Sequence, residues 1–400
     1  MSLRSGITTG TCAAAAAKAA AMLLCGQSAA GAVSVLLPGG QSVSVAVTRA
    51  ERLSPDSATA AVRKDAGDDP DVTHGLSIEA TVTLHEGTGV EFLAGEGVGT
   101  VTMPGLQIGV GQPAINPGPR AMIEANLRQV TLRGAVVESA IPGGREIAAK
   151  TFNPRLGVEG GLSVLGTTGI VRPYCREALL HALTCSLDVA AACGVTHPVL
   201  VPGNIGMSAA RRHFRLSPQQ GVEVGNEWGF MIDQVSARPF ESLLVVGHPG
   251  KLAKLSVGQW NTHSSHSSDG PAIVQALLTQ RGLSRCLGLS PLVPGGVVPT
   301  VEGLFAAMAD EDRVTAANAL ALAVADAISR RWESGAVAAG VLNRKRSAGV
   351  DGRAGVDGRA GADGQVGEEE AVGSPRTVAV VLINMQGEIL GSAGELARWR

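Results

Sequence analysis

The sequence predicts an α+β N-terminal domain with an antiparallel sheet, followed by an α/β domain with a mainly parallel sheet. Three observations predict this architecture. The chain has 400 residues, more than one hydrophobic core usually serves. In its first half, strand-like runs flank short turns that contain proline and glycine, which indicates antiparallel hairpins. In its second half, short apolar runs end close to a glycine and alternate with helical segments, which is typical of a parallel sheet.

The first half opens with a predicted helix. Thr8, Thr9 and Thr11 stand just before an alanine-rich run. Threonine is a favourable N-cap and alanine is the best helix former, so the helix should begin near Thr11 and end before Gly26. The other elements expected in this half are a hairpin of 33–37 with 43–47, strands at 58–62 and 78–84, a helix from Asn116 to about Arg128, and a hairpin of 136–141 with 146–151.

The second half is expected to build the parallel sheet. Its apolar runs lie at 162–165, 198–201, 222–224 and 243–246. Ligands of such sheets bind beyond the carboxyl ends of the strands, where the glycine-rich loops of this chain fall. Helices are expected at 176–193, at 208–214, at 252–257, from 272, and at 301–331.

A Gly/Asp repeat interrupts this pattern near the C-terminus. Residues 348–364 carry Ala-Gly-Val-Asp-Gly-Arg twice, followed by a drifted copy, and this composition is typical of disorder. A strand is expected at 377–384, with 387–390 as a hairpin partner. The expected organisation is an α+β domain at 1–160, an α/β domain at 161–342, a low-complexity insertion at 343–375, and a C-terminal strand or hairpin at 376–400 that rejoins a sheet.

Composition argues against several classes of protein. The net charge of -2 gives no reason to expect nucleic-acid or membrane binding. No run of about 18 uncharged apolar residues appears, so no membrane-spanning helix is expected. Lys18 interrupts the apolar N-terminal run, and a Gly/Thr turn stands where a signal peptide would be basic. The 6 cysteines lack the paired spacing of a zinc site. We therefore expect reduced thiols, no protein-bound metal and a cytoplasmic location.

The common nucleotide and hydrolase motifs are incomplete. The glycines at 95–99 lack the last glycine of G-x-G-x-x-G, and no helix is expected after them. Gly250-Lys251 lacks both the upstream glycine and the downstream Ser or Thr of a P-loop. No G-x-S-x-G is present. A kinase, a dinucleotide enzyme of the usual type and an α/β-hydrolase are thereby disfavoured.

Two groups of candidate binding residues lie before residue 175. The start of the first helix, with Thr9 and Thr11, is either an anion site for a carboxylate or a plain N-cap. A second group combines glycines that follow an expected strand with nearby cations that could pair with carboxylates. The alternative for this group is an ordinary turn with solvated cations. Its members are Lys150, Arg155, Gly166, Thr167, Thr168, Gly169 and Arg172.

Two further groups lie after residue 200. Gly203, Asn204 and Gly206 follow an expected strand, and they form either a ligand loop or a turn in which the asparagine caps a helix. The last group has histidine and lysine donors that suit a polycarboxylate better than a metal, a surface loop being the alternative. It comprises His248, Lys251, Lys254 and His263. The acidic segment from Asp65 to His74 is expected to be a solvated turn.

Several long segments together resemble the cobalt-precorrin-5B C(1)-methyltransferase family (CbiD family) of anaerobic cobalamin biosynthesis. The resemblance extends in order from near the start of the chain to about Arg331, and the Gly/Asp repeat is no part of it. The segments are Ser5–Ala15, Asp65–Gly75, Ala114–Arg120, Lys150–Pro173, Val201–Gly206, Gly247–Leu255 and Asn261–Ser264.

The resemblance implies an S-adenosylmethionine-dependent enzyme that methylates C-1 of a cobalt-containing ring bearing acetate and propionate groups. On this hypothesis Gly166–Gly169 and Gly203–Gly206 hold the donor. The basic residues and the two threonines bind the carboxylates, and His248 or His263 accepts a proton. The alternatives are a non-catalytic corrinoid-binding protein and a group-transfer enzyme of another class acting on a polycarboxylate. The sequence leaves a homodimer open.

Overall fold

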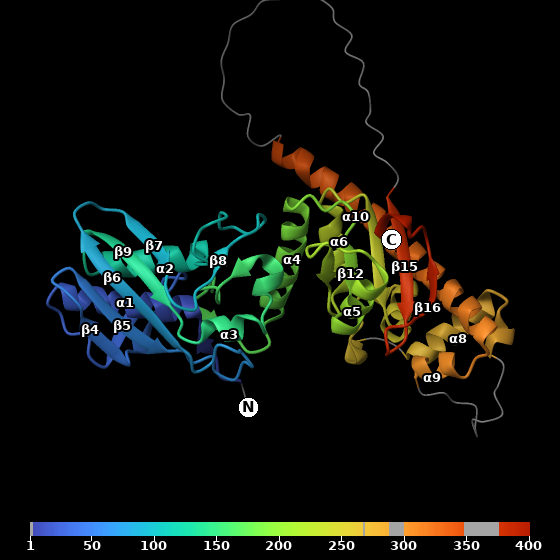
Figure 1. Ribbon diagram of the computed structural model, residues 1–400, viewed down its shortest axis with the longest axis horizontal. Helices are drawn as coiled ribbons and strands as arrows, with labels where there is room; N and C mark the ends of the chain where they lie inside the picture. The colour runs from blue at the N-terminus through green and yellow to red at the C-terminus, as the bar shows by residue number, and fades with distance from the viewer. Residues whose placement is uncertain (1–2, 267–268, 288–299, 348–375) are drawn as a thin grey trace, which may run out of the picture. The chain divides into compact units, whose positions relative to one another are not determined.

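The computed structural model describes residues 3–266, 269–287, 300–347 and 376–400, and the chain divides into two compact units (Figure 1). We call Met1–Cys193 unit 1 and Gly194–Arg400 unit 2. The boundary expected at residue 160 falls inside unit 1. Residues 161–165 belong with unit 1 because Leu162 and Val164 donate backbone hydrogen bonds to Gly97 and Ala114. Most of the expected insertion, at 348–375, lies outside the described residues.

Unit 1 is built around a mixed five-stranded sheet. Its strand order is β4-β5-β6-β9-β7, and the pairs are antiparallel except for β7 with β9. The strands are β4 (Arg49–Arg52), β5 (Ser57–Arg63), β6 (Ser77–His85), β7 (Val90–Ala94) and β9 (Gly134–Ala140). Beside the sheet lie the hairpin β2 (Ala32–Leu36) with β3 (Ser42–Ala46), and the short pairs β1 (Gly6–Ile7) with β11 (Ile170–Val171) and β8 (Thr100–Val101) with β10 (Val158–Glu159). The helices of this unit are α1 (Thr9–Leu24), α2 (Pro117–Arg128), α3 (Gly144–Ala148) and α4 (Arg176–Ala192), with a 3-10 turn at Asn153–Leu156.

Helix α1 forms the core of unit 1. Every residue from Thr9 to Ala21 is buried, and the helix packs against α2, β2, β4, β5 and β6. Alanine side chains are short enough to let neighbours approach on all sides. The buried Lys18 ammonium donates to the carbonyl of Ser34 at 2.5 Å and to Oε1 of Gln129 at 2.6 Å. Burial lowers the pKa of Lys18. The expected helix is therefore confirmed, and it begins at Thr9 rather than near Thr11.

Unit 2 contains a second sheet, of order β13-β12-β14-β15-β16. The first four strands are parallel and β16 is antiparallel to β15. The strands are β12 (Val199–Val201), β13 (Gly221–Glu223), β14 (Ser242–Gly247), β15 (Thr377–Ile383) and β16 (Ile389–Ala393). The helices are α5 (Asn204–His213), α6 (Trp228–Ser236), α7 (Pro249–Ser256), α8 (Gly270–Gln280), α9 (Val301–Ala306) and α10 (Asp310–Ser347), with 3-10 turns at Ser264–His266, Ser284–Leu287 and Ala397–Trp399. The C-terminal strands thus join the sheet of unit 2.

The described residues are a mixed α/β structure with antiparallel and parallel sheets, but some expected elements are wrong. Residues 146–151 do not pair with β9, because β6 and β7 occupy its two edges. Gly143 turns the chain with φ +77 into the short helix α3 instead. The run at 162–165 forms only isolated bridges in unit 1, so it is no strand of the parallel sheet. Strands β4 and β7 and helix α6 were not expected.

No helix among the described residues is both long enough and apolar enough to cross a membrane.

Candidate functional site

The carboxyl edge of the parallel sheet in unit 2 brings two of the expected groups together. In this sheet β12 lies between β13 and β14. The connection after β12 therefore runs toward β13, whereas the connection after β14 runs in the opposite direction, toward β15. Such a reversal opens a crevice beyond the strand ends. Gly203 follows β12 and leads into α5, while His248 follows β14 and leads into α7. A Cβ on Gly206 would stand 2.8 Å from the carbonyl oxygen of Val246, so glycine allows α5 to pack closely on β14.

A cavity of about 610 Å³ lies at this edge. Its wall combines residues from the ends of β14 and β15 with residues from the starts of α7, α8 and α9. Four lining side chains can carry charge: His248, Lys254, Asp269 and Glu302. The remaining lining residues are Gly250, Ser264, Gly270, Pro271, Thr300, Val301 and Met385.

His248 uses both ring nitrogens within the protein. The backbone N–H of Gly250 donates to Nδ1 at 3.0 Å, which makes His248 the N-cap of α7. Nδ1 is therefore the unprotonated nitrogen, and Nε2–H donates to Oε2 of Glu302 at 2.6 Å. The second oxygen of Glu302 accepts the backbone N–H of Met385 at 3.4 Å. The imidazole is a neutral donor that orients a carboxylate at the cavity wall.

Two lysines follow on α7. Lys254 is 7% exposed, and its ammonium donates to the backbone carbonyl of Thr262 at 3.2 Å. Lys251, one turn earlier, is partly buried. Burial lowers its pKa, the positive charge of Lys254 adds to the decrease, and the carboxylate of Glu223 opposes it. Burial thus disfavours the charged form of Lys251, which follows His248 on α7.

His263 lies near the cavity but does not line it. Its imidazole is exposed, and Nδ1 is 2.7 Å from Oγ of Ser265. The preceding Asn261 is held by Glu227, which accepts from its amide nitrogen at 3.2 Å. The backbone carbonyl between them, at Thr262, accepts from Lys254. The segment that carries His263 is therefore fastened to the same helix that carries the two lysines.

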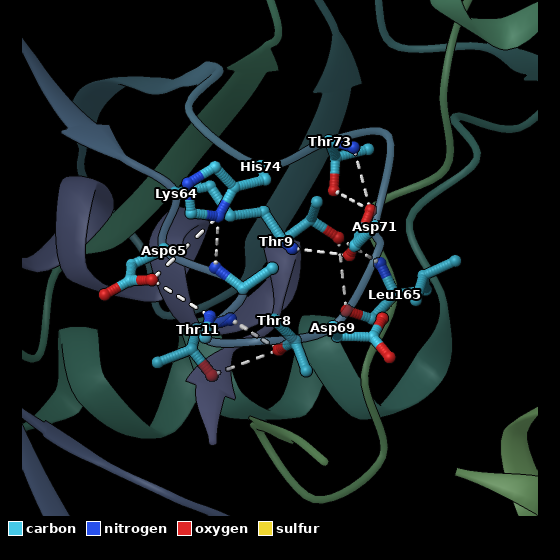
Figure 2. A network of polar contacts seen from close by, with 12 residues as sticks. Thr8, Thr9, Thr11, Lys64, Asp65, Asp69, Asp71, Thr73, His74 and Leu165 are labelled. Atoms are coloured by element: carbon cyan, nitrogen blue, oxygen red, sulfur yellow. Dashed lines mark hydrogen bonds and ion pairs between the residues drawn. The ribbon is translucent and has the colours of Figure 1, made fainter. Parts of the chain in front are cut away.

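In unit 1 the start of α1 meets the glycine loop at 166–169. Oγ1 of Thr9 bonds both the carbonyl and the N–H of Leu165, at 3.2 and 2.9 Å. Oγ1 of Thr11 donates to the carbonyl of Gly169 at 2.6 Å, and the N–H of Thr11 is capped by Thr8 at 3.1 Å. Gly166 has φ +132, and a Cβ there would overlap Thr8. The two hydroxyls hold the chain's own loop against the helix. Figure 2 shows Thr9 and Thr11 at the helix start together with Leu165.

The acidic segment beside this helix start is a solvated turn only in part, because one of its carboxylates is paired with a buried lysine. Lys64 has a side chain only 1% exposed, and its ammonium lies 2.6 Å from Oδ2 of Asp71. Asp71 also accepts from the N–H and the hydroxyl of Thr73, at 2.8 and 2.6 Å. Burial raises the pKa of Asp71, but the hydrogen bonds from Lys64 and Thr73 outweigh it, so the net pKa is lowered. Figure 2 shows this ion pair beside the threonines.

The other expected cations of unit 1 lie on its surface. Lys150, Arg155 and Arg172 are all exposed. The guanidinium of Arg155 stands over the ring of Phe152, 5.8 Å from its centroid. Thr167 and Thr168 are exposed as well, and the hydroxyl of Thr168 bonds the backbone of Ile170. The structure thus gathers the first two groups in unit 1 and the last two in unit 2.

The two acidic residues that line the cavity were not among the candidates taken from the sequence. Glu302 lies 54 residues beyond His248, and Asp269 precedes α8. Both stand at helix starts, where acidic residues are common for dipole reasons alone, so no sequence signal separated them from ordinary helix caps. Within the part of the chain that the structure describes, no three His, Cys, Asp or Glu side chains are grouped to hold a metal ion.

Comparisons with known proteins give a consistent result. The CbiD family profile matches residues 1–173. A protein of Syntrophotalea carbinolica named cobalt-precorrin-5B C(1)-methyltransferase is 47% identical over 100% of this chain and 99% of its own length. Proteins of the same name from Alkaliphilus metalliredigens and Pseudomonas aeruginosa are 43% and 42% identical, over 72% and 82% of this chain and 77% and 87% of their own. A crystal structure of the cobalamin biosynthesis protein CbiD from Archaeoglobus fulgidus is 28% identical, covers 70% of this chain and 85% of that one, and superposes with a TM-score of 0.35.

Proposed function

The chain belongs to the cobalt-precorrin-5B C(1)-methyltransferase (CbiD) family, and we propose that its methyl donor binds at the carboxyl edge of the sheet in unit 2. The enzyme methylates C-1 of cobalt-precorrin-5B with S-adenosylmethionine, giving cobalt-precorrin-6A in cobalamin biosynthesis. The observation that carries this function is the 47% identity to a relative over the whole chain. The cobalt enters as part of the corrinoid substrate.

Catalysis of this reaction depends mainly on holding the methyl donor and the ring carbon in position. The sulfonium already activates the methyl group, and the electron-rich ring carbon attacks it in line. Holding two reactants in such a geometry contributes up to about 7–11 kcal/mol. The cavity of about 610 Å³ fits the donor in size, because pockets for ligands of that class measure roughly 300–1,000 Å³. Gly203 and Asn204, at the end of the neighbouring strand β12, would let the donor approach the backbone closely, while Gly206 acts indirectly by letting α5 pack on β14.

Cationic and hydroxyl side chains are proposed to bind the carboxylates of the corrinoid. The exposed Lys150, Arg155 and Arg172 of unit 1 are suited to pair with ring carboxylates in water, and the exposed hydroxyls of the 166–169 loop lie in the same chain segment. Lys251, in unit 2, is proposed as a further cation for a ring carboxylate. Thr9 and Thr11 would act on this surface indirectly, by fixing that loop through its carbonyls.

His263 is the better candidate for a proton acceptor. Its imidazole is exposed and can be reached by a bound ring, whereas His248 lies at the cavity wall with its two ring nitrogens bonded to Gly250 and Glu302. We therefore propose that His248 acts through Glu302 rather than directly. A cytoplasmic location belongs to the same proposal, supported by six cysteines that are all free thiols.

Mass spectrometry tests the function. The purified protein is incubated with S-adenosylmethionine and cobalt-precorrin-5B, and the corrinoid should gain one methyl with one equivalent of S-adenosylhomocysteine formed. NMR of the product should place the methyl on C-1. No methyl gain on intact, bound substrate would refute the activity.

Steady-state kinetics test the cationic surface. Arg155→Ala and Arg172→Ala should each raise the corrinoid KM with little change in the donor KM. Arg215→Ala, which removes an exposed arginine of unit 2, is the matched control and should leave both constants unchanged. An unchanged corrinoid KM in both unit 1 variants would remove these residues from the proposal.

A further inference from the structure

We propose that the cavity of unit 2 receives the zwitterionic amino-acid end of the methyl donor. The carboxylates of Glu302 and Asp269 face its ammonium group, and the ammonium of Lys254 faces its carboxylate. This assignment rests on the proposed donor site above and deepens it. It adds two acidic residues that the sequence did not single out, and it moves Lys254 from the corrinoid to the donor.

The charges on the wall decide which reactant the cavity suits. Two carboxylates and one buried ammonium line it, while His248 is neutral by its hydrogen bonds. The corrinoid carries many carboxylates and no cation on its side chains, so Glu302 and Asp269 would repel it. Two like charges 4 Å apart repel by about 4 kcal/mol at the effective dielectric of a protein surface. The donor brings an ammonium and a carboxylate together, and both find an opposite charge.

Glu302 is fixed before any ligand arrives. Nε2–H of His248 holds one carboxylate oxygen at 2.6 Å, and the N–H of Met385 reaches the other at 3.4 Å. Because His248 is itself locked by the N–H of Gly250, the direction of the carboxylate follows from the start of α7. A carboxylate held in this way loses little conformational entropy when it binds a cation.

Asp269 and Lys254 complete the arrangement from two other elements. Asp269 is the N-cap residue of α8, yet its side chain makes no cap hydrogen bond, so within the described chain its charge is not spent on the helix. Lys254 is 7% exposed and is aimed by the carbonyl of Thr262. Lys254 therefore supplies a positive charge at a buried position of the cavity wall.

Calorimetric titration with three ligands tests the assignment without any corrinoid. The ligands are S-adenosylhomocysteine, its decarboxylated analogue and its deaminated analogue. Lys254→Met should lose affinity for S-adenosylhomocysteine by about 10- to 100-fold but bind the decarboxylated analogue as the wild type does. Glu302→Gln and Asp269→Asn should lose affinity for S-adenosylhomocysteine and keep that for the deaminated analogue. Glu333→Gln, an exposed acid of α10, is the control and should change nothing.

The pattern across ligands separates a direct contact from a folding defect. A variant that weakens all three ligands equally would overturn its assigned contact. So would a variant that leaves all three unchanged or raises only the corrinoid KM. The near-isosteric Glu302→Gln keeps the test sound if Lys254→Met does not fold, which tryptophan fluorescence melting reveals. A wild type that methylates the corrinoid but shows no preference for S-adenosylhomocysteine over either analogue would overturn this inference alone, whereas a wild type that binds no donor would overturn the proposed function too.

Discussion

Helices α1 and α7 both begin with a side-chain cap, but the polar groups at the two helix starts have different partners. Each helix begins after a residue whose side chain caps it, Thr8 for α1 and His248 for α7. At α1 the hydroxyls of Thr9 and Thr11 go on to hold the chain's own loop, and Lys64 is neutralised by Asp71. At α7 the capping imidazole goes on to hold Glu302, which lines a cavity. A polar helix start therefore indicates a ligand site only where tertiary packing leaves its partners facing open space.

The largest expected effect comes from removing the ion pair of Lys64 and Asp71 near the start of α1. Asp71→Ala leaves the ammonium of Lys64 buried without its partner, and we expect the free energy of unfolding to fall by about 3–5 kcal/mol. Urea unfolding followed by circular dichroism measures the loss. All four tryptophans lie in unit 2, at 228, 260, 332 and 399, so their fluorescence serves as a readout of the other unit. The double variant Lys64→Met with Asp71→Ala should lose less, and an equal loss would argue against the ion pair as the cause.

A second test removes one hydroxyl from the start of α1. Thr11→Val preserves the shape of the side chain but deletes the donor to the carbonyl of Gly169 at 2.6 Å. A buried acceptor that loses a partner costs about 1–3 kcal/mol, here toward the lower value because Gly169 also accepts from the N–H of Thr8. The urea midpoint should fall accordingly. Thr168→Val, which removes an exposed hydroxyl, is the control and should have little effect; similar midpoints for the two variants would contradict the assigned role.

A third test separates the two roles of His248. His248→Ala removes the N-cap of α7 and frees Glu302, so we expect a stability loss of about 1 kcal/mol together with weaker donor binding. Asparagine is a favourable N-cap, so His248→Asn should recover the stability but not the affinity. Fluorescence melting and calorimetry measure the two effects. Recovery of both by asparagine would mean that the histidine serves the helix alone.

The smallest expected effect is on the free energy of unfolding at low pH. The hydrogen bond from Arg4 and, next, that from the N–H of Gly67 lower the pKa of Asp65 from 3.8 to about 2. A lowered carboxylate pKa stabilises the folded state above the ordinary value, and this contribution disappears as the pH falls from about 4 toward 2. The contribution is small because Arg4 and Asp65 are both exposed. Asp65→Asn should flatten unfolding stability between these pH values, and an unchanged slope would contradict the pairing.

Local patterns predicted the elements whose residues decide their own structure. The alanine run predicted α1, and the run of β-branched and other apolar residues near Val380 predicted β15. The Pro-Gly-Gly turn at 38–40 gave a true hairpin, but the same turn at 142–144 led into a helix. The two turns are alike in sequence, and only the second follows a strand that already has partners on both sides. Pairing of that kind is set by distant residues and carries no local signal.

The site was predicted in the same uneven way. His248, Lys254 and the loop at Gly203 were singled out as candidates because they follow buried strands in the sequence. Glu302 and Asp269 were not, because a helix start explains an acidic residue without any ligand. Thr9 and Thr11 fitted an anion site equally well until the carbonyls of Leu165 and Gly169 supplied their partners. The distance along the chain, 156 residues for Thr9, places that information beyond local reasoning.

The complete burial of α1 has a consequence for synthesis. This helix precedes its partners along the chain, and one of its main partners, α2, ends only at Arg128. At about 5–20 residues per second, the ribosome needs roughly 5–20 s to make the chain in between. The strands β2, β4, β5 and β6, which also pack on α1, are complete by His85, so during the rest of that time only the side facing α2 lacks its partner. The enclosure of α1 is therefore finished in two stages, first by strands and then by a helix.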